Sequence, residues 1–269
     1  MRIGLGDAWR AMRTPDGPAT LHLRSFGYDI QAEAWGPGAE WALDSAPGLV
    51  GAFDDDSAFE PHHDVVAELW RYNRGVRITR AGGVMQVLIP AILEQKVTGS
   101  EARRAYRSMV LATSEAAPGD AGLFLPPEPA RIAETPYFAF HPWGVEQRRA
   151  ETIRGACAQA ARLEMCAVLP TDQANGRLLA LPGVGPWTVA EVARMALGDP
   201  DALSVGDYHL SNIVCWALAR RSRGSDEEML ELLEPYRGQR GRVQRLLEAG
   251  HITAPAYGPR VEVGHIERI

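Results

Sequence analysis

The sequence predicts an α+β fold, with a mainly α-helical body and a small antiparallel β-domain at the N-terminus. From residue 64 onward, apolar residues recur every three or four positions, as on the buried face of a helix. Between residues 17 and 53, polar and apolar residues alternate, and glycines and prolines separate the short segments, as in strands joined by turns. We therefore expect a β-domain over residues 1–62 and a helical region over residues 63–269.

The composition is that of an ordinary globular protein. Of the 269 residues, 46% are hydrophobic and 23% are charged, close to the average of soluble domains. The first residues lack the apolar core of a signal peptide, and apolar segments such as residues 87–93 are too short to cross a bilayer. These features predict a cytoplasmic protein without a membrane partner.

The net charge of −6 is unevenly distributed along the chain. Residues 1–75 hold six arginines and twelve acidic residues, including the run Asp54–Asp56, whereas basic and acidic residues balance in the remainder. A balanced remainder can still gather arginines on one face, so the total charge does not exclude a polyanionic partner.

The three cysteines are Cys157, Cys166 and Cys215. Their spacing contains no C-x-x-C pair and no zinc-binding pattern with histidine. We expect them to be small buried apolar residues.

Residues 172–197 have the pattern of two helices joined by a tight hairpin. Gly183 and Gly185 permit a turn that residues with a Cβ would not make, and Pro186 suits the first position of a second helix. Gly198 then ends the apolar helical pattern. The backbone amides at the start of the second helix would form an anion site that fits a phosphate. The alternative is a turn that only packs two helices together.

The residues around this hairpin resemble those of a known family. Leu-Pro-Gly-Val-Gly-Pro-Trp-Thr at residues 181–188 is followed by Ser-Val-Gly-Asp-Tyr at residues 204–208. This combination resembles the helix–hairpin–helix DNA glycosylase superfamily, and within it the bacterial 3-methyladenine DNA glycosylase II (AlkA-like) type. The resemblance implies two helical subdomains that flank a cleft, double-stranded DNA as the partner, a monomeric state and association with the nucleoid.

The resemblance makes Asp207 the catalytic residue. Cleavage of an N-glycosidic bond develops positive charge on the sugar, which a nearby carboxylate stabilises while water attacks. The target nucleotide must first leave the base stack. The alternative role of Asp207 is a simple N-cap for the helix that follows it.

The same comparison predicts the base pocket. Trp187 would bind a cationic alkylated purine by cation–π attraction, and Tyr208 matches a tyrosine of the family. Glu191 is the third residue of the predicted pocket and departs from the family pattern, which has tyrosine four residues after the tryptophan. A glutamate there could favour a cationic base or could simply face solvent. Superfamily members with lyase activity carry a lysine at the position of Trp187, so the resemblance implies a monofunctional enzyme.

Further residues are predicted to contact DNA. Gln95 ends a helix at the place where the family contacts the unpaired partner base, and Lys96 takes the position of an apolar wedge that fills the space of the flipped nucleotide. Lys96 could instead be a solvated residue at a helix end. The remaining predicted DNA contacts are Gly183, Gly185, Thr188 and Arg237.

No cofactor is expected to be required. The resemblance implies a monovalent cation, Na⁺ or K⁺, at the carbonyl groups of Leu179, Leu181 and Val184. It implies no iron–sulfur cluster, because the branch that carries one uses four cysteines in one loop.

The resemblance thus predicts a glycosylase that excises alkylated purines, similar to 3-methyladenine, in base excision repair. One alternative is a damage sensor that binds DNA through the hairpin without catalysis. Another is a glycosylase for uracil or oxidised bases.

Overall fold

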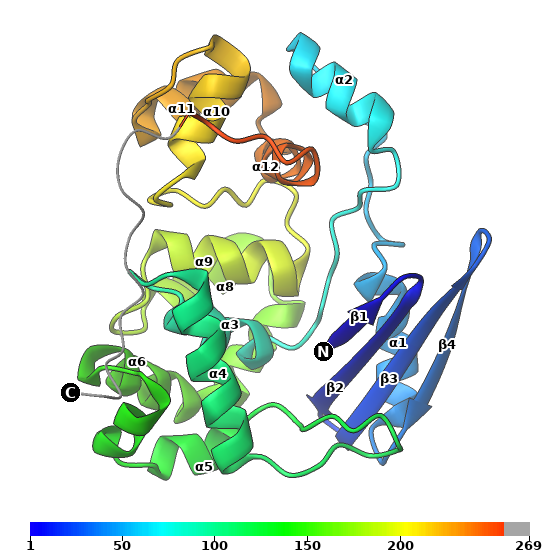
Figure 1. Ribbon diagram of the computed structural model, residues 1–269, viewed down its shortest axis with the longest axis vertical. Coiled ribbons are helices and arrows are strands. Elements are labelled where there is room, and N and C mark those ends of the chain that lie inside the picture. The colour runs from blue at the N-terminus through cyan, green and yellow to red at the C-terminus, as the bar shows by residue number, and fades with distance from the viewer. Residues whose placement is uncertain (256–269) are drawn as a thin grey trace.

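A computed structural model describes residues 1–255 of the chain. The described chain forms an N-terminal sheet and two groups of helices, one above the other in Figure 1. The predicted helical region extends to residue 269, and its last part, residues 256–269, lies outside the described residues.

The N-terminal sheet is antiparallel, as predicted. Its four strands follow chain order, and they are β1 (Arg2–Gly4), β2 (Asp7–Thr14), β3 (Gly17–Phe26) and β4 (Asp29–Trp35). One face is covered by helix α1 (Ala39–Leu49), and Met12, Ala19 and Leu21 of the sheet form a small core with Ala42 and Ala46 of α1.

The prediction of strands as far as residue 53 was wrong for α1. Ala42 and Ala46 are one helical turn apart and are both buried. Small residues at this spacing let the helix lie close against the sheet, and the helix continues through Pro47 to Leu49.

The lower group of helices forms the larger core. Its centre is α3 (Met85–Leu93), whose Leu88, Ile92 and Leu93 are completely buried. The elements around it are α4 (Gly99–Thr113), α5 (Pro129–Glu134), η1 (Tyr137–Trp143), α6 (Gln147–Cys157), α7 (Ala160–Glu164), η2 (Met165–Val168), α8 (Thr171–Leu179), α9 (Pro186–Val192) and η3 (Ala193–Leu197). Cys157 and Cys166 are buried in this core, and Cys215 is buried in the upper group, as predicted.

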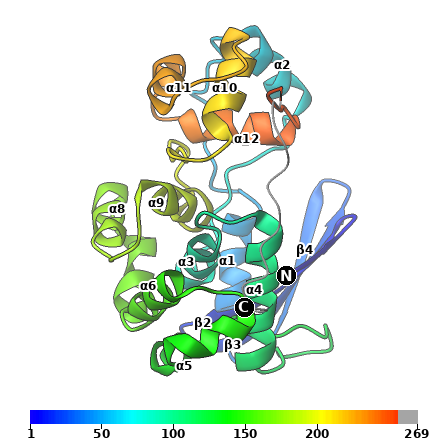
Figure 2. The ribbon, with the colours of Figure 1, turned by 60° about the vertical axis from the view of Figure 1, so that its left-hand side comes forward.

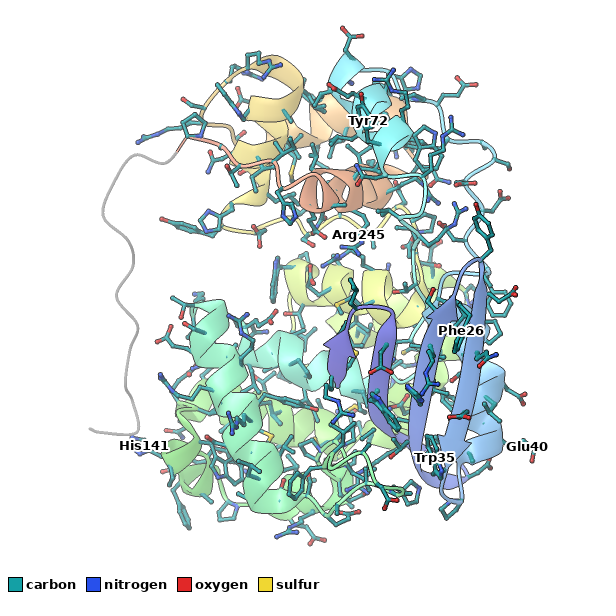
Figure 3. The ribbon with its side chains drawn as sticks, turned by 45° about the vertical axis from the view of Figure 1, so that its right-hand side comes forward. Phe26, Trp35, Glu40, Tyr72, His141 and Arg245 are labelled. Carbon is teal, nitrogen blue, oxygen red and sulfur yellow. The ribbon has the colours of Figure 1, made fainter. Side chains whose placement is uncertain are left out.

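The upper group of helices is built from two distant parts of the chain. Helix α2 (Asp64–Tyr72) packs with the C-terminal helices and not beside α3, as Figures 1 and 2 show. The C-terminal elements are α10 (Leu210–Ala219), α11 (Asp226–Leu233), η4 (Glu234–Tyr236) and α12 (Arg240–Ala249). Figure 3 places Tyr72 of α2 at one end of the molecule and Trp35 of the sheet toward the other. The two helical cores confirm the prediction of two helical subdomains.

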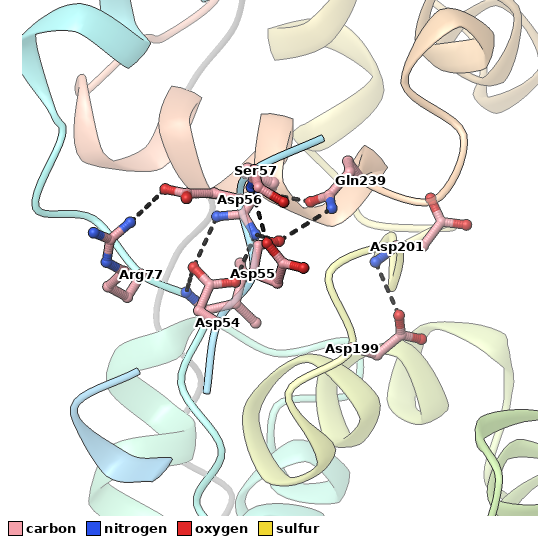
Figure 4. A network of polar contacts seen from close by, with 10 residues as sticks. Asp54, Asp55, Asp56, Ser57, Arg77, Asp199, Asp201 and Gln239 are labelled. Carbon is pink, nitrogen blue, oxygen red and sulfur yellow. Dashed lines mark hydrogen bonds and ion pairs between the residues drawn. The ribbon is translucent and has the colours of Figure 1, made fainter. Parts of the chain in front are cut away.

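The acidic run Asp54–Asp56 connects these parts (Figure 4). Asp54 forms an ion pair with Arg242 of α12 in which the two side chains are 3% and 2% exposed, and it also accepts a hydrogen bond from the amide of Ile78. Asp56 pairs with Arg77. The charges of Asp54 and Asp56 are therefore neutralised within the protein, and these ion pairs anchor the connection from the sheet to the upper helices.

Up to residue 255, none of the helices combines the length and the apolar composition that crossing a bilayer requires.

Candidate active site

The predicted helix–hairpin–helix is present between α8 and α9. Gly183 has a φ of +85°, and a Cβ built there would lie 2.2 Å from the hydroxyl oxygen of Thr152. Gly185 has a φ of −112°, and a Cβ there would meet nothing within 4 Å. The prediction that the turn needs glycine at both positions is therefore right for Gly183 and wrong for Gly185, whose backbone is extended.

The second helix of the motif begins and ends as predicted. Pro186 is its first residue, where a missing N–H costs no hydrogen bond. Gly198 ends the helix in the left-handed region, with a φ of +72°. This helix directs Trp187 and Glu191, which are four residues apart, to the same side.

Trp187 and Asp207 lie in contact, although they belong to different subdomains. The indole Nε1 of Trp187 donates a hydrogen bond to Oδ2 of Asp207 across 3.3 Å. Oδ1 of Asp207 accepts hydrogen bonds from the backbone amides of His209 and Leu210, at 2.8 and 2.9 Å. Asp207 thus caps α10 with one oxygen, and its other oxygen remains beside the indole. The capping role and a chemical role are compatible.

The environment of Glu191 differs from that of an open base pocket. Its side chain is buried, and one oxygen accepts a hydrogen bond from Oγ of Ser204. The other oxygen forms an ion pair with Arg194 at 2.8 Å. Both oxygens of Glu191 are therefore already bound within the protein. Sequence reasoning missed Ser204 and Arg194, although an arginine three residues after a glutamate is a known signal for a helical ion pair.

A second glutamate lies near this pair. Partial desolvation of its carboxyl raises the pKa of Glu94, although the residue is exposed overall, and the neighbouring charge of Glu191 raises it further. Burial would lower the pKa of Arg194, but Glu191 and Glu248 outweigh it and raise the pKa. Arg194 contacts Glu248 of α12 at 3.2 Å, so this charged cluster joins the two helical subdomains.

The loop between α3 and α4 is tied to the hairpin. Nε2 of Gln95 donates to the carbonyl oxygen of Gly183 at 3.0 Å and to the hydroxyl of Thr188 at 2.9 Å. Thr188 is only 1% exposed, so its side chain faces Gln95 and is turned away from solvent. Lys96 follows in the left-handed region with a φ of +57°, and it is exposed in the middle of this tied loop.

The other predicted site residues lie on the surface. Tyr208 is 78% exposed, and its ring packs edge-on against His209. Arg237 is exposed and is held by Glu234 through two hydrogen bonds.

The predicted cation-binding carbonyls lie in the hairpin itself. The carbonyl oxygen of Leu181 accepts a hydrogen bond from the amide of Val184 at 3.1 Å, which leaves it one lone pair for another ligand. Carbonyl oxygens are ligands that hard cations bind. The cation at Leu179, Leu181 and Val184 remains a prediction. In residues 1–255, no group of three or more histidine, cysteine, aspartate or glutamate side chains is arranged to hold a metal ion.

No protein-family model matches the chain. A stretch of 68 residues, 24% of the chain, is 44% identical to the probable bifunctional transcriptional activator/DNA repair enzyme AlkA of Mycobacterium tuberculosis. This stretch spans only 14% of that relative's length.

Solved structures match over most of the chain. The 3-methyladenine DNA glycosylase of Archaeoglobus fulgidus has a TM-score of 0.70 at 20% identity, over 90% of this chain and 86% of that one. The 8-oxoguanine glycosylase/lyase of Clostridium acetobutylicum, in complex with double-stranded DNA, has a TM-score of 0.68 at 14% identity, over 91% and 89% of the two chains. The fold expected from the hairpin is confirmed: this chain has the fold of the helix–hairpin–helix DNA glycosylases.

Proposed function

We propose that the protein is a DNA glycosylase that flips alkylated purines similar to 3-methyladenine out of duplex DNA and cleaves their N-glycosidic bond. The observation that carries this proposal is the contact between Trp187 and Asp207. It brings an aromatic face and a carboxylate together next to a helix–hairpin–helix, in a fold shared with DNA glycosylases.

The chemistry assigned to Asp207 is electrostatic. As the glycosidic bond breaks, positive charge develops on the sugar, and the carboxylate stabilises that charge while water adds to the anomeric carbon. Three N–H donors orient this carboxylate before the substrate arrives. An alkylated purine carries a positive charge and leaves as a neutral base, so no strong general acid is needed.

Recognition of the base is assigned to aromatic rings. The indole of Trp187 would attract a cationic purine by about 2 kcal/mol or more when desolvated, and the exposed ring of Tyr208 lies next to Asp207 in the chain. Glu191 adds negative charge nearby, but its bound carboxylate favours a role in holding the site together.

DNA binding is assigned to the hairpin and to the tied loop beside it. The amides at the start of α9 would bind a phosphate. Gly183 would shape the hairpin, and Gly185, beside open space, would let the strand approach closely. Lys96 would enter the duplex or meet a phosphate from the loop that Gln95 holds against the hairpin. Arg237 would reach a more distant phosphate.

We further propose that the enzyme has no lyase activity. Trp187 stands where lyase members have their lysine, and Lys96 is the only lysine of the sequence. The TM-score with an 8-oxoguanine glycosylase/lyase, 0.68, is nearly as high as that with a 3-methyladenine glycosylase, 0.70. Oxidised substrates therefore belong in the test.

The test is the release of free bases from duplex DNA, measured by chromatography. The wild-type protein should release 3-methyladenine from methylated DNA, and Asp207→Asn should lower the rate at least about tenfold. Asp44→Asn, on the exposed surface of α1, is the matched control and should leave the rate unchanged.

Other outcomes would change the assigned substrate, the assigned activity or the role of Asp207. Release of uracil or of an oxidised base, without 3-methyladenine, would replace the substrate assignment. Binding of damaged duplexes without release of any base would support the sensor. Release that Asp207→Asn leaves unchanged would overturn the role of Asp207.

A further inference from the structure

The segment that carries Asp207 contains no helix or strand between η3 and α10, and it lies against α12. A Cβ at Gly241 of α12 would be 2.4 Å from the carbonyl oxygen of Ala202, so the two backbones are in close contact. The amide of Arg242 donates to the carbonyl of Pro200 at 3.0 Å, and Asp201 pairs with Arg240. Figure 4 shows Asp201 of this segment below Gln239 at the start of α12, and Asp199 beyond it, bonded to the amide of Asp201. Helix α12 thus fixes the first half of the segment.

Gln244 of α12 binds Ser204, two residues after Ala202 in the segment, with both ends of its amide. Its Oε1 accepts from the amide of Ser204 at 3.2 Å, and its Nε2 donates to Oγ of Ser204 at 3.1 Å. The same Nε2 also donates to Glu248 at 3.0 Å. Ser204 and Gln244 are 1% and 4% exposed. Because these polar groups are buried, each lost bond leaves an unsatisfied group, and the arrangement favours one geometry.

Ser204 is bonded to the helix that carries Trp187 and to Asp207 itself. Its hydroxyl donates to Glu191, which lies one turn after Trp187 on the hairpin helix. Its carbonyl oxygen accepts a hydrogen bond from the amide of Asp207 at 3.1 Å. A displacement of Ser204 would therefore move the backbone of Asp207 relative to Trp187.

We infer that Gln244 is a positioning residue for Asp207, which acts through Ser204 and holds the carboxylate at the indole of Trp187. The inference rests on the proposed function, because a positioned carboxylate matters for the rate only if the protein excises a base. The hydrogen bonds of Gln244 go to Ser204 and Glu248 and not to Asp207 or Trp187, so its action is to fix the segment that carries Asp207.

The test is Gln244→Met, which keeps the length of the side chain and removes all three of its hydrogen bonds. The matched control is Gln86→Met. Gln86 is partly buried and donates to the carbonyl of Arg13 at 3.1 Å, far from Asp207 in the sequence and joined to the N-terminal sheet. Ser204→Ala is the second variant, since it removes the hydroxyl and leaves the amide bond to Gln244.

Three quantities are measured on each protein. The first is the single-turnover rate of base release, and the second is the dissociation constant for a duplex with an uncleavable abasic analogue. The third is the NMR resonance of the Trp187 indole N–H, assigned by its disappearance in Trp187→Phe, which reports the contact with Asp207 without any turnover.

The inference predicts that Gln244→Met shifts the indole resonance and lowers the rate at least about tenfold, with a dissociation constant within about twofold of wild type. Ser204→Ala should shift the indole resonance and lower the rate to a smaller extent. In the double variant the two effects should be less than additive, because both substitutions remove the hydrogen bond from Nε2 of Gln244 to Oγ of Ser204. Gln86→Met should change none of the three.

An unchanged resonance with an unchanged rate would overturn the inference. So would a fall in rate and DNA binding together that Gln86→Met reproduces, since this indicates general loosening of the fold. If the wild-type protein releases no base, the proposed function fails, and the indole resonance alone then decides whether Gln244 positions Asp207. If Gln244→Met does not fold, Ser204→Ala decides.

Discussion

The indole N–H of Trp187 and the carboxylate of Asp207 meet across 3.3 Å, and they come from the two helical subdomains. Trp187 belongs to the hairpin helix, while Asp207 caps α10, the first of the C-terminal helices in the upper group, through the amides of His209 and Leu210. The contact therefore depends on how the subdomains are placed, and it responds to changes in either of them.

Trp187→Phe separates the two roles of the tryptophan. Phenylalanine keeps an aromatic face for a base but cannot donate to Asp207. We expect the rate of base release to fall by about ten- to 150-fold, since a lost hydrogen bond to a charged group is worth about 1.5–3 kcal/mol, and to fall less than in Asp207→Asn. Single-turnover kinetics on methylated duplex DNA measure the rates of Trp187→Phe and Asp207→Asn. A rate equal to that of wild type would show that the contact has no part in the reaction.

Gly183→Ala and Gly185→Ala form a matched pair at the hairpin. At Gly183, alanine meets a positive φ and the hydroxyl of Thr152, so we expect the protein to lose about 1–3 kcal/mol of unfolding free energy. At Gly185 the backbone is extended and the space is open, so alanine should change stability little. Thermal unfolding of the two variants checks this, and equal losses would contradict it.

Borohydride trapping tests for lyase chemistry. A Schiff base needs an amine, and Lys96 is the sole lysine. We expect no covalent adduct with abasic or damaged duplex DNA in the presence of borohydride, as seen on denaturing gels. An adduct that disappears in Lys96→Arg would show that Lys96 is a nucleophile, and the enzyme would then be bifunctional.

The pair Asp54–Arg242 should dominate the acid stability of the upper subdomain. Burial would raise the pKa of Asp54, but its hydrogen bonds with Arg242 and Ile78 outweigh burial and hold the pKa below its usual value. The stabilisation is therefore complete above the unfolded pKa of about 3.9 and is lost as the pH falls through the lower, folded pKa. The melting temperature should be steady from about pH 7 to 5 and should fall below about pH 4.

Substitutions of two ion pairs give the control for this prediction. Asp54→Asn leaves Arg242 buried without its counter-charge and should cost about 3 kcal/mol or more at neutral pH. Glu234→Gln breaks a pair whose side chains are 56% and 67% exposed, and it should cost no more than about 1 kcal/mol. Thermal unfolding from pH 3 to 7 compares them, and similar losses in both variants would contradict the assignment.

The sequence by itself determined the features that depend on residues close together in the chain. The helical repeat, the hairpin with Gly183, the helix start at Pro186 and the stop at Gly198 were all predicted correctly. Each rests on a local rule, such as a positive φ or a missing N–H, that a few neighbouring residues satisfy. The family resemblance of the hairpin was enough to predict the fold.

Only the tertiary structure decided which partners the other side chains contact. Glu191 was expected at a base, and it pairs with Arg194 and Ser204. Ser204 and Gln244 are forty positions apart in the chain, and no local rule joins them. Such contacts arise because the packing of α12 against the Asp207 segment brings buried polar groups together, and buried polar groups must find partners wherever the fold supplies them.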